Sequence, residues 1–378
     1  MTVPLPLPIE LINQSARFNT AIQEIMSSSV IALDTESNSF HRYPEQLCLI
    51  QAASKQNIYI IDTISLQDLN PLKKTLENNS IKKVLHSADY DIRSLDRHYG
   101  IRIRNLYDTS IASRFVGIVQ FGLSYIIKDL LGVTIHKSKR LQKADWGQRP
   151  LSSEAIEYAA NDVRYLFALQ KFLDMKLQTL GRTTWVAEEC ARLEEVRYSS
   201  PNPDTAYLFI KGTHKLDGCG LAILRSLYLF REKEARRWRR PPTLLIPDVV
   251  LSSLANNPTM SLAEVPSLGQ IGLKRFGRGL RKALHNGFIA PPINRPPVIS
   301  TDRLNNKQIK RLSLLKIWRT SLGETLSLDP SLLWPKASLE RLAKAPDTLE
   351  IELKSKDIRH WQREQFASSL QDFLKSLP

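Results

Sequence analysis

The chain has few cysteines, no long apolar run and a deficit of acidic residues. Its 378 residues include three cysteines, Cys48, Cys190 and Cys219, which are odd in number and far apart. This spacing argues against a zinc site or a disulfide framework, and it fits a reduced, intracellular compartment. No apolar stretch approaches the ~20 residues of a transmembrane helix, and the N-terminus lacks the pattern of a secretory signal. We therefore expect a cytoplasmic protein that does not span a membrane.

The charge balance is strongly basic. Lys and Arg number 53 against 38 Asp and Glu, which gives a formal net charge of +15 at pH 7. Such a surplus is typical of proteins that bind polyanions, although an anionic membrane surface would also attract it. The sequence contains no Walker-type phosphate loop, and Gly277-Arg278-Gly279 is too short to act as one. Composition alone therefore points to a polyanionic partner.

Two acidic residues close the first strongly apolar run. Residues Val30 to Asp34 have the pattern of a buried strand, and Glu36 follows two positions after Asp34. Side chains two residues apart on a strand point to the same face, so the two carboxylates should lie side by side at its end. Adjacent anions repel each other unless something neutralises them.

A third carboxylate lies near the start of a predicted helix. Residues 81–85 form a second apolar run, after which helical spacing begins and continues to a stop signal at Gly100. Asp91 therefore lies near the N-terminus of this helix. Asp89, two residues earlier, is the alternative candidate for the same role, or else it caps the helix.

A tyrosine and a fourth carboxylate share one face of a later helix. Its apolar pattern starts at residues 152–154 and continues to Leu169, with Tyr158 and Asp162 one turn apart. Hydrolysis of a phosphodiester by two Mg²⁺ or Mn²⁺ ions about 3.5–4 Å apart requires hard oxygen ligands and a group that orients the attacking water. The four carboxylates offer such ligands, and the tyrosine offers a hydroxyl for the water.

Each of these pieces alone has an ordinary explanation, as a turn after a strand or a solvated helix face. In combination and in this order they are far more specific. The segments Ile31–Glu36, His86–Asp91 and Tyr158–Asp162 resemble the three exonuclease motifs of the ribonuclease D family. Residues 47–51 and 142–151 resemble that family's second strand and the segment before its last catalytic helix.

The resemblance implies a metal-dependent 3′–5′ exoribonuclease of the DEDDy type, named for four acidic residues and a tyrosine. Asp34, Glu36, Asp91 and Asp162 would bind two divalent cations, Mg²⁺ or Mn²⁺, while Tyr158 positions the nucleophilic water. The implied reaction releases 5′-mononucleotides from single-stranded RNA 3′ ends, in the processing of tRNA precursors and other stable RNAs. Ala144 departs from the small hydroxyl residue that the family usually carries, but it touches no proposed ligand.

The resemblance also implies the fold class. This is an α/β ribonuclease H-like, DnaQ-like exonuclease domain, with a mixed sheet flanked by helices, followed by two all-α HRDC-like domains of the kind shared with RecQ-type helicases. We predict boundaries at 1–205, 211–290 and 300–378. Residues 199–204 and the Pro-rich residues 290–297 interrupt the regular patterns and are expected to be linkers. Trp318-Arg319 and Asp329-Pro330 echo Phe230-Arg231 and Pro247-Asp248, which suggests an internal repeat.

Several basic and aromatic residues are candidates for RNA contacts. Residues Lys211 to Phe288 hold fourteen Lys and Arg against five Asp and Glu. Basic clusters are usually solvated helix faces, but here a tryptophan within one offers a base-stacking surface. By the resemblance, Phe40 would stack on the terminal base, or else it is a core contact. The candidates are Phe40, Lys137, Lys139, Arg140, Arg236, Arg237, Trp238, Arg239 and Arg240.

Two other functions compete with RNA trimming. A DNA 3′–5′ exonuclease of the proofreading or Werner-helicase kind would use the same carboxylates, because sugar discrimination depends on contacts to the 2′-hydroxyl. A catalytically silent RNA-binding scaffold would keep the fold, but retention of all four carboxylates and the tyrosine argues against it. No long heptad seam demands a dimer, so we expect a monomer. The sequence names no protein partner.

Overall fold

The computed structural model describes residues 7–135, 138–295 and 303–377. Its N-terminal part is built on a six-stranded mixed sheet in the order β1-β4-β3-β2-β5-β6. β3 runs antiparallel to its neighbours β2 and β4, and the other three pairings are parallel. The strands are β1 (Ile9–Ile12), β2 (Val30–Ser37), β3 (Leu47–Ala53), β4 (Ile58–Asp62), β5 (Lys82–Leu85) and β6 (Leu106–Asp108).

The apolar runs explain the centre of this sheet. Every residue of β3 and β4 is buried, as expected for strands covered on both faces. β2 carries the predicted acidic pair, and it extends three residues beyond Asp34 instead of ending there. Its pairing with β3 shifts register between Glu36 and Ser37, where the strand ends.

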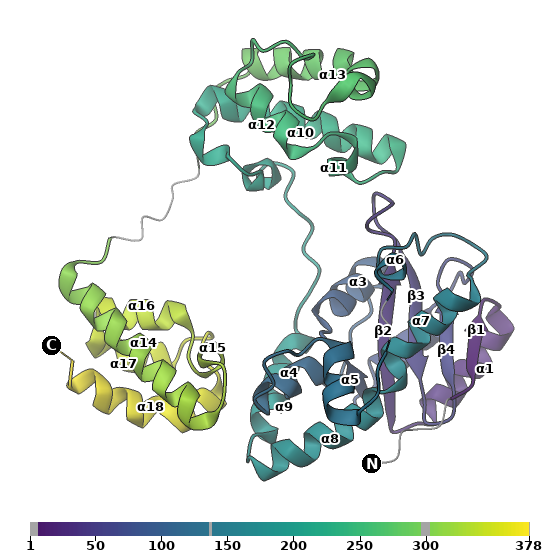
Figure 1. Cartoon of the computed structure of the whole chain (residues 1–378), viewed down its shortest axis with the longest axis vertical. Helices are drawn as coiled ribbons and strands as arrows, with labels where there is room; N and C mark the ends of the chain where they lie inside the picture. The colour runs from purple at the N-terminus through teal and green to yellow at the C-terminus, as the bar shows by residue number, and fades with distance from the viewer. Residues whose placement is uncertain (1–6, 136–137, 296–302, 378) are drawn as a thin grey trace.

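Helices cover the sheet, and α7 lies across the strands and contacts β1 to β4 (Figure 1). Gly100 and Gly132 end α3 and α5 in the left-handed conformation, and the stop predicted at Gly100 is confirmed. The long pattern that starts at residues 152–154 is two helices instead of one, because the backbone leaves helical geometry at Tyr165. The helices are α1 (Ser15–Met26), α2 (Asn70–Leu76), α3 (Asp89–Tyr99), α4 (Thr109–Phe115), α5 (Leu123–Leu131), α6 (Lys139–Gln142), α7 (Ser153–Arg164), α8 (Leu166–Thr179) and α9 (Thr183–Glu194).

Two helical units follow the sheet domain, and we call α10–α13 the first helical unit and α14–α18 the second. Short 3₁₀ turns, Ala206–Phe209 and Thr213–Lys215, precede the first unit, and another, Pro346–Thr348, lies within the second. The first unit contains α10 (Gly218–Trp238), α11 (Pro242–Leu245), α12 (Asp248–Asn256) and α13 (Gly269–Ile289). The second contains α14 (Asn306–Leu326), α15 (Pro330–Leu333), α16 (Lys336–Lys344), α17 (Leu349–Leu353) and α18 (His360–Lys375).

The helical units repeat one local arrangement. In each, a long helix, a helix of four residues and a helix of nine residues follow one another. Arg231 donates to the carbonyl of Ile246 at the end of α11, and Arg319 donates to the carbonyl of Trp334 at the end of α15. The same capping contact at the same place supports the predicted internal repeat.

The buried residues form two separate apolar clusters. One comprises residues of the first helical unit together with Tyr207 and Ile210 of the preceding 3₁₀ turn and its end. The other joins the sheet domain and the second helical unit in one continuous core. Within the described residues, no helix is both long and apolar enough to span a bilayer. All three cysteines are free thiols, and Cys219 alone among them is exposed.

Candidate active site

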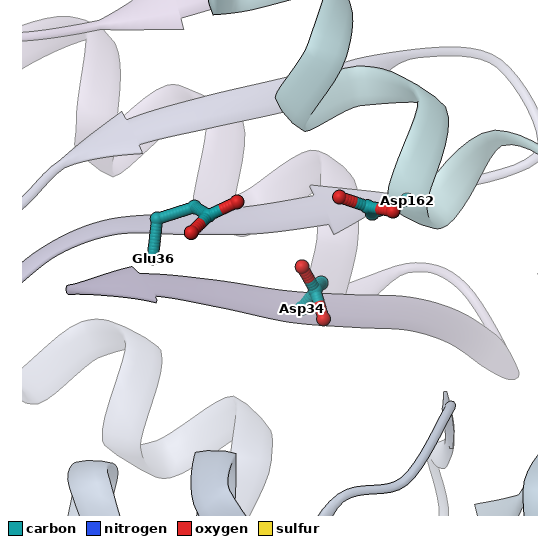
Figure 2. Close-up of side chains that lie close together, drawn as sticks. All are labelled: Asp34, Glu36 and Asp162. Atoms are coloured by element: carbon teal, nitrogen blue, oxygen red, sulfur yellow. The ribbon is translucent and has the colours of Figure 1, made fainter. Parts of the chain in front are cut away.

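Three acidic side chains converge beside the sheet. Asp34 and Glu36 project from the same face of β2, and Asp162 approaches them from α7 (Figure 2). Carboxylate oxygens of the three residues all lie within 4.8 Å of one another. The period-two alternation of β2 and the packing of α7 over that face together produce this meeting. Such a set of hard oxygen donors suits a divalent cation and would be repulsive without one.

Asp91 lies next to this group without belonging to it. Its carboxylate accepts a hydrogen bond of 2.5 Å from the hydroxyl of Thr35, the residue between Asp34 and Glu36. The side chain is buried, and burial raises the pKa of the Asp91 carboxyl to about 7, while the hydrogen bond from Thr35 acts in the opposite direction. Asp91 is thus tied to β2 through the side chain of the residue that separates Asp34 and Glu36 in the sequence.

Asp89 has a different environment. It is exposed and forms an ion pair with Arg93, one turn along α3, with an N–O distance of 2.8 Å. The expectation that Asp89 caps the helix is wrong, because the N-cap residue is Ala88 and no side chain caps it there. The side chain of Asp89 instead points along the surface of the first turn.

The turn before α3 is held by Asp108, a residue that the sequence patterns did not single out. The Asp108 carboxylate accepts hydrogen bonds from the backbone amides of Ser87 and Ala88 and also caps α4. An acidic residue before Thr109-Ser110 is a helix-start signal, so the sequence could have identified Asp108 as the cap of α4. It gave no signal for the hydrogen bonds of Asp108 to the turn before α3. His86 hydrogen-bonds the Thr109 hydroxyl at 2.9 Å, which ties this turn to the start of α4.

Tyr158 stands beside the three carboxylates on α7. Its ring lies 5.9 Å from that of Trp146, so the indole helps to fix its orientation. Burial raises the pKa of the Tyr158 phenol well above its ordinary value, and the negative charges of Asp162, Glu36 and Asp34 add to the shift. The phenol therefore remains protonated at neutral pH and can donate a hydrogen bond.

Comparisons with known proteins place this arrangement in a family. Residues 9–178 match a family profile described as 3′–5′ exonuclease. Ribonuclease D of Shewanella sp. is 32% identical over 69% of this chain and 67% of that protein. Ribonuclease D of Zymomonas mobilis is 31% identical over 75% of this chain and 73% of that protein. The chain belongs to the ribonuclease D family. It is accordingly a 3′–5′ exoribonuclease, a hydrolase of phosphodiester bonds, in a family that depends on divalent metal ions.

A solved ribonuclease D structure matches nearly the whole chain. The crystal structure of Escherichia coli RNase D, described as an exoribonuclease involved in structured RNA processing, has a TM-score of 0.74 and 25% identity. The match covers 98% of this chain and 100% of that one, so the helical units are included. The predicted fold class, a mixed-sheet exonuclease domain followed by two helical domains of HRDC type, is confirmed.

The candidate RNA contacts of this chain lie in two places. Phe40 is 57% exposed in the loop after β2, so it is not the core contact that was the alternative for it. Lys139 and Arg140 lie on the short α6, where Arg140 pairs with Glu154 across the surface. Lys137 lies outside the described residues.

The residues of the basic cluster at the end of α10 have different surroundings. Arg237 pairs with Glu234 on the same helix, at a distance of 3.6 Å. The indole of Trp238 is covered by the guanidinium of Arg275 at 4.8 Å from the ring centroid, which leaves less of its surface for a base. Arg236 and Arg239 line a cavity shared with the sheet domain. Arg240 is exposed just beyond the helix.

Proposed function

We propose that this protein removes nucleotides one at a time from the 3′ ends of single-stranded RNA, tRNA precursors included, and releases 5′-mononucleotides. The observation that carries the proposal is the convergence of Asp34, Glu36 and Asp162 beside a protonated Tyr158. We further propose a monomer acting in the cytoplasm, in keeping with three unpaired cysteines. We divide the chain at 1–205, 211–290 and 300–378.

The acidic residues have the chemistry to hold the metal. Asp34, Glu36 and Asp162 would be ligands, and Asp91 would complete the set from its position beside Thr35. Two ions, Mg²⁺ or Mn²⁺, would supply charge neutralisation and an activated water when bound. Tyr158 donates its phenolic hydrogen bond to the attacking water and so fixes the direction of attack. The fixed Trp146 ring keeps Tyr158 in that orientation.

A time course on end-labelled strands tests the reaction. RNA and DNA of one sequence, labelled at the 5′ end, are incubated with Mg²⁺, Mn²⁺ or EDTA. We expect a ladder that shortens stepwise on RNA, faster than on DNA and only with metal. Faster loss of the DNA would favour the proofreading type of exonuclease, and no cleavage of either strand would favour a binding scaffold.

Removal of one carboxylate charge should abolish hydrolysis. Asp34→Asn keeps the side-chain shape but lowers the negative charge available to the metal, so we expect activity to fall by about 10³-fold or more. RNA binding, measured by fluorescence anisotropy, should persist. Asp91→Asn should behave likewise, whereas Asp89→Asn, at an exposed position paired with Arg93, serves as the matched control and should remain active. Full activity of the Asp34 variant would overturn the ligand assignment.

Removal of the phenolic hydroxyl should slow turnover without weakening metal binding. For Tyr158→Phe we expect kcat to fall by about 10²-fold, the typical effect of one positioned hydrogen-bond donor. The metal concentration for half-maximal activity should change little. An unchanged kcat would mean that another group orients the water.

A further inference from the structure

A cavity of about 620 Å³ lies between the sheet domain and the first helical unit. The loop after β2 forms one wall, with Asn38, Arg42 and Tyr43, and Gly147 closes it from the segment before α7. Arg236 and Arg239, at the end of α10, form the opposite wall. The cavity therefore requires both parts of the chain, and its volume lies within the range of small-ligand sites.

Positive charge dominates this cavity. Three arginines line it, and the acidic residue among the lining, Glu45, pairs with Arg97 and so has little charge to offer them. Arg42 forms an ion pair with the largely buried carboxylate of Asp145, with an N–O distance of 3.3 Å. Arg236 stacks over the ring of Tyr43, 5.5 Å from its centroid. An anion in the cavity would thus meet guanidinium groups that are only partly neutralised.

Arg239 stands out among the three. It ends α10 in the left-handed conformation, with a φ of 49°, and its side chain is exposed. Within the described part of the chain it makes no ion pair, in contrast to Arg237, two residues earlier. A helix C-terminus already attracts cations, but a guanidinium that leaves its five donors to solvent is also suited to a bidentate oxyanion contact.

Two residues of the cavity wall directly follow segments of the candidate active site. Asn38 follows Glu36 by two residues, and its side chain accepts a hydrogen bond from the Gln46 amide, which closes the loop. Gly147 follows Trp146, whose ring packs near Tyr158. His41 also bonds the carbonyl of Lys143 at 2.7 Å, so the loop is braced on both sides. A strand that ends at the three carboxylates would have this cavity beside it.

We propose that the cavity binds a backbone phosphodiester of the RNA strand, 5′ to the bond being cleaved, and that Arg239 and Arg236 complete the site from the first helical unit. The inference rests on the proposed exoribonuclease function. A planar guanidinium matches a phosphate through paired N–H donors, and arginines on facing walls would enclose the group. The first helical unit thereby contributes to the affinity for strands long enough to reach it.

Substrate length provides the test. A dinucleotide without a 5′ phosphate contains only the bond to be cleaved, whereas a strand of about 12 nucleotides also fills the cavity. For Arg239→Ala and for the double variant R236A/R239A in the full chain, we expect KM on the longer RNA to rise by about tenfold, with kcat little changed. The rate on the dinucleotide should stay the same. The slope of log affinity against log salt concentration should weaken by about 0.7 for each RNA phosphate that the variant no longer neutralises.

Controls separate this site from general charge and from folding. Arg225→Ala removes one charge from the same helix, at an ion pair with Asp204 outside the cavity, and should leave both rates unchanged. Arg239→Lys should restore the salt slope more than it restores KM, because an ammonium lacks the paired donors. Thermal unfolding of each variant should match that of the parent.

Equal losses of activity on both substrate lengths would overturn the phosphate site while leaving the exonuclease intact. An effect of Arg225→Ala as large as that of Arg239→Ala would do the same. Competition by free phosphate against the dinucleotide, but not against the longer RNA, would mean that the ion binds elsewhere and would also count against the site. An inactive parent protein would instead refute the proposed function on which the inference rests.

Discussion

The two helical units have the same order of helices but join the sheet domain differently. In the second unit, Trp361 of α18 stacks on Trp185 of α9 with ring centroids 4.6 Å apart and an interplanar angle of 17°. Phe115 meets the edge of the same indole. The second unit therefore shares one apolar core with the nuclease. The first unit has its own core, and Tyr43 of the nuclease contacts its Glu232 and Arg236.

The polar contacts that attach the two helical units to the nuclease also differ. The carboxylate of Glu188 accepts hydrogen bonds from the backbone amides of His360 and Trp361 at the start of α18, where a helix favours negative charge. Arg359 pairs with Glu189 at 2.9 Å. The described contacts of the first unit centre on Tyr43, which hydrogen-bonds Glu232 and lies under the guanidinium of Arg236.

One helical architecture thus takes two roles in this molecule. A unit fused through tryptophans cannot move without exposing apolar surface, so it acts as an extension of the nuclease core. A unit attached through a few polar side chains can adjust its position at low cost. More than half of the net positive charge lies in the first helical unit, which we call the adjustable unit, and this suits contact with a polyanion.

Disrupting the core shared by the nuclease and the second helical unit should have the largest effect on stability. Trp361→Ala removes the indole that packs on Trp185 and Phe115, and we expect a loss of about 3–5 kcal/mol in the free energy of unfolding of the nuclease. Chemical denaturation followed by far-UV circular dichroism measures it. Trp361→Phe, the control, should lose less because it keeps a ring in place. A nuclease transition unaffected by Trp361→Ala would show that the two parts do not share a core in solution.

The corresponding change in the first unit should stay local. Phe276 is buried in the core of that unit, so Phe276→Ala should destabilise it by about 3–4 kcal/mol. Amide hydrogen exchange, read peptide by peptide, would follow this unit separately from the nuclease. The nuclease transition should not move. A joint shift of both transitions would mean that the first unit unfolds together with the nuclease.

Loosening the first unit at its polar contact should have the smallest effect. Tyr43→Phe deletes the hydrogen bond to Glu232 but keeps the ring under Arg236, and we expect less than about 1 kcal/mol of lost stability. Limited proteolysis of residues 195–205, which connect the two parts, should speed up slightly. If cleavage there became many times faster, this single hydrogen bond would be the main attachment of the unit.

The sequence predicted the sheet and the acidic group because both depend on local periodicity. Asp34 and Glu36 share a face of β2 through period-two alternation, and Tyr158 and Asp162 share a face of α7 through one helical turn. The exact end of β2 and the break at Tyr165 were missed, since no proline or glycine marks either place. Asp91 was placed near a helix start, but its partner Thr35 lies 56 residues away and leaves no local signal.

Local sequence patterns could not predict the packing of residues that lie far apart in the chain. Trp185 and Trp361 each fit an ordinary apolar helix face, and nothing in either segment indicates that they stack on each other. The cavity beside Arg239 needs the loop after β2 and the end of α10 at one place, which only the folded chain provides. The basic cluster was visible in the sequence, whereas the pairing of Arg237 with Glu234 and the covering of Trp238 by Arg275 were not.

The positions of the three cysteines allow a fluorescent label to be placed on the first helical unit alone. Cys48 and Cys190 are buried, and burial raises the pKa of both to about 12, so neither reacts readily at neutral pH. Cys219 is exposed near the start of α10. A maleimide dye should therefore attach at this one position without any engineered cysteine. Its fluorescence would report, on single molecules, whether the first unit changes its position when RNA arrives.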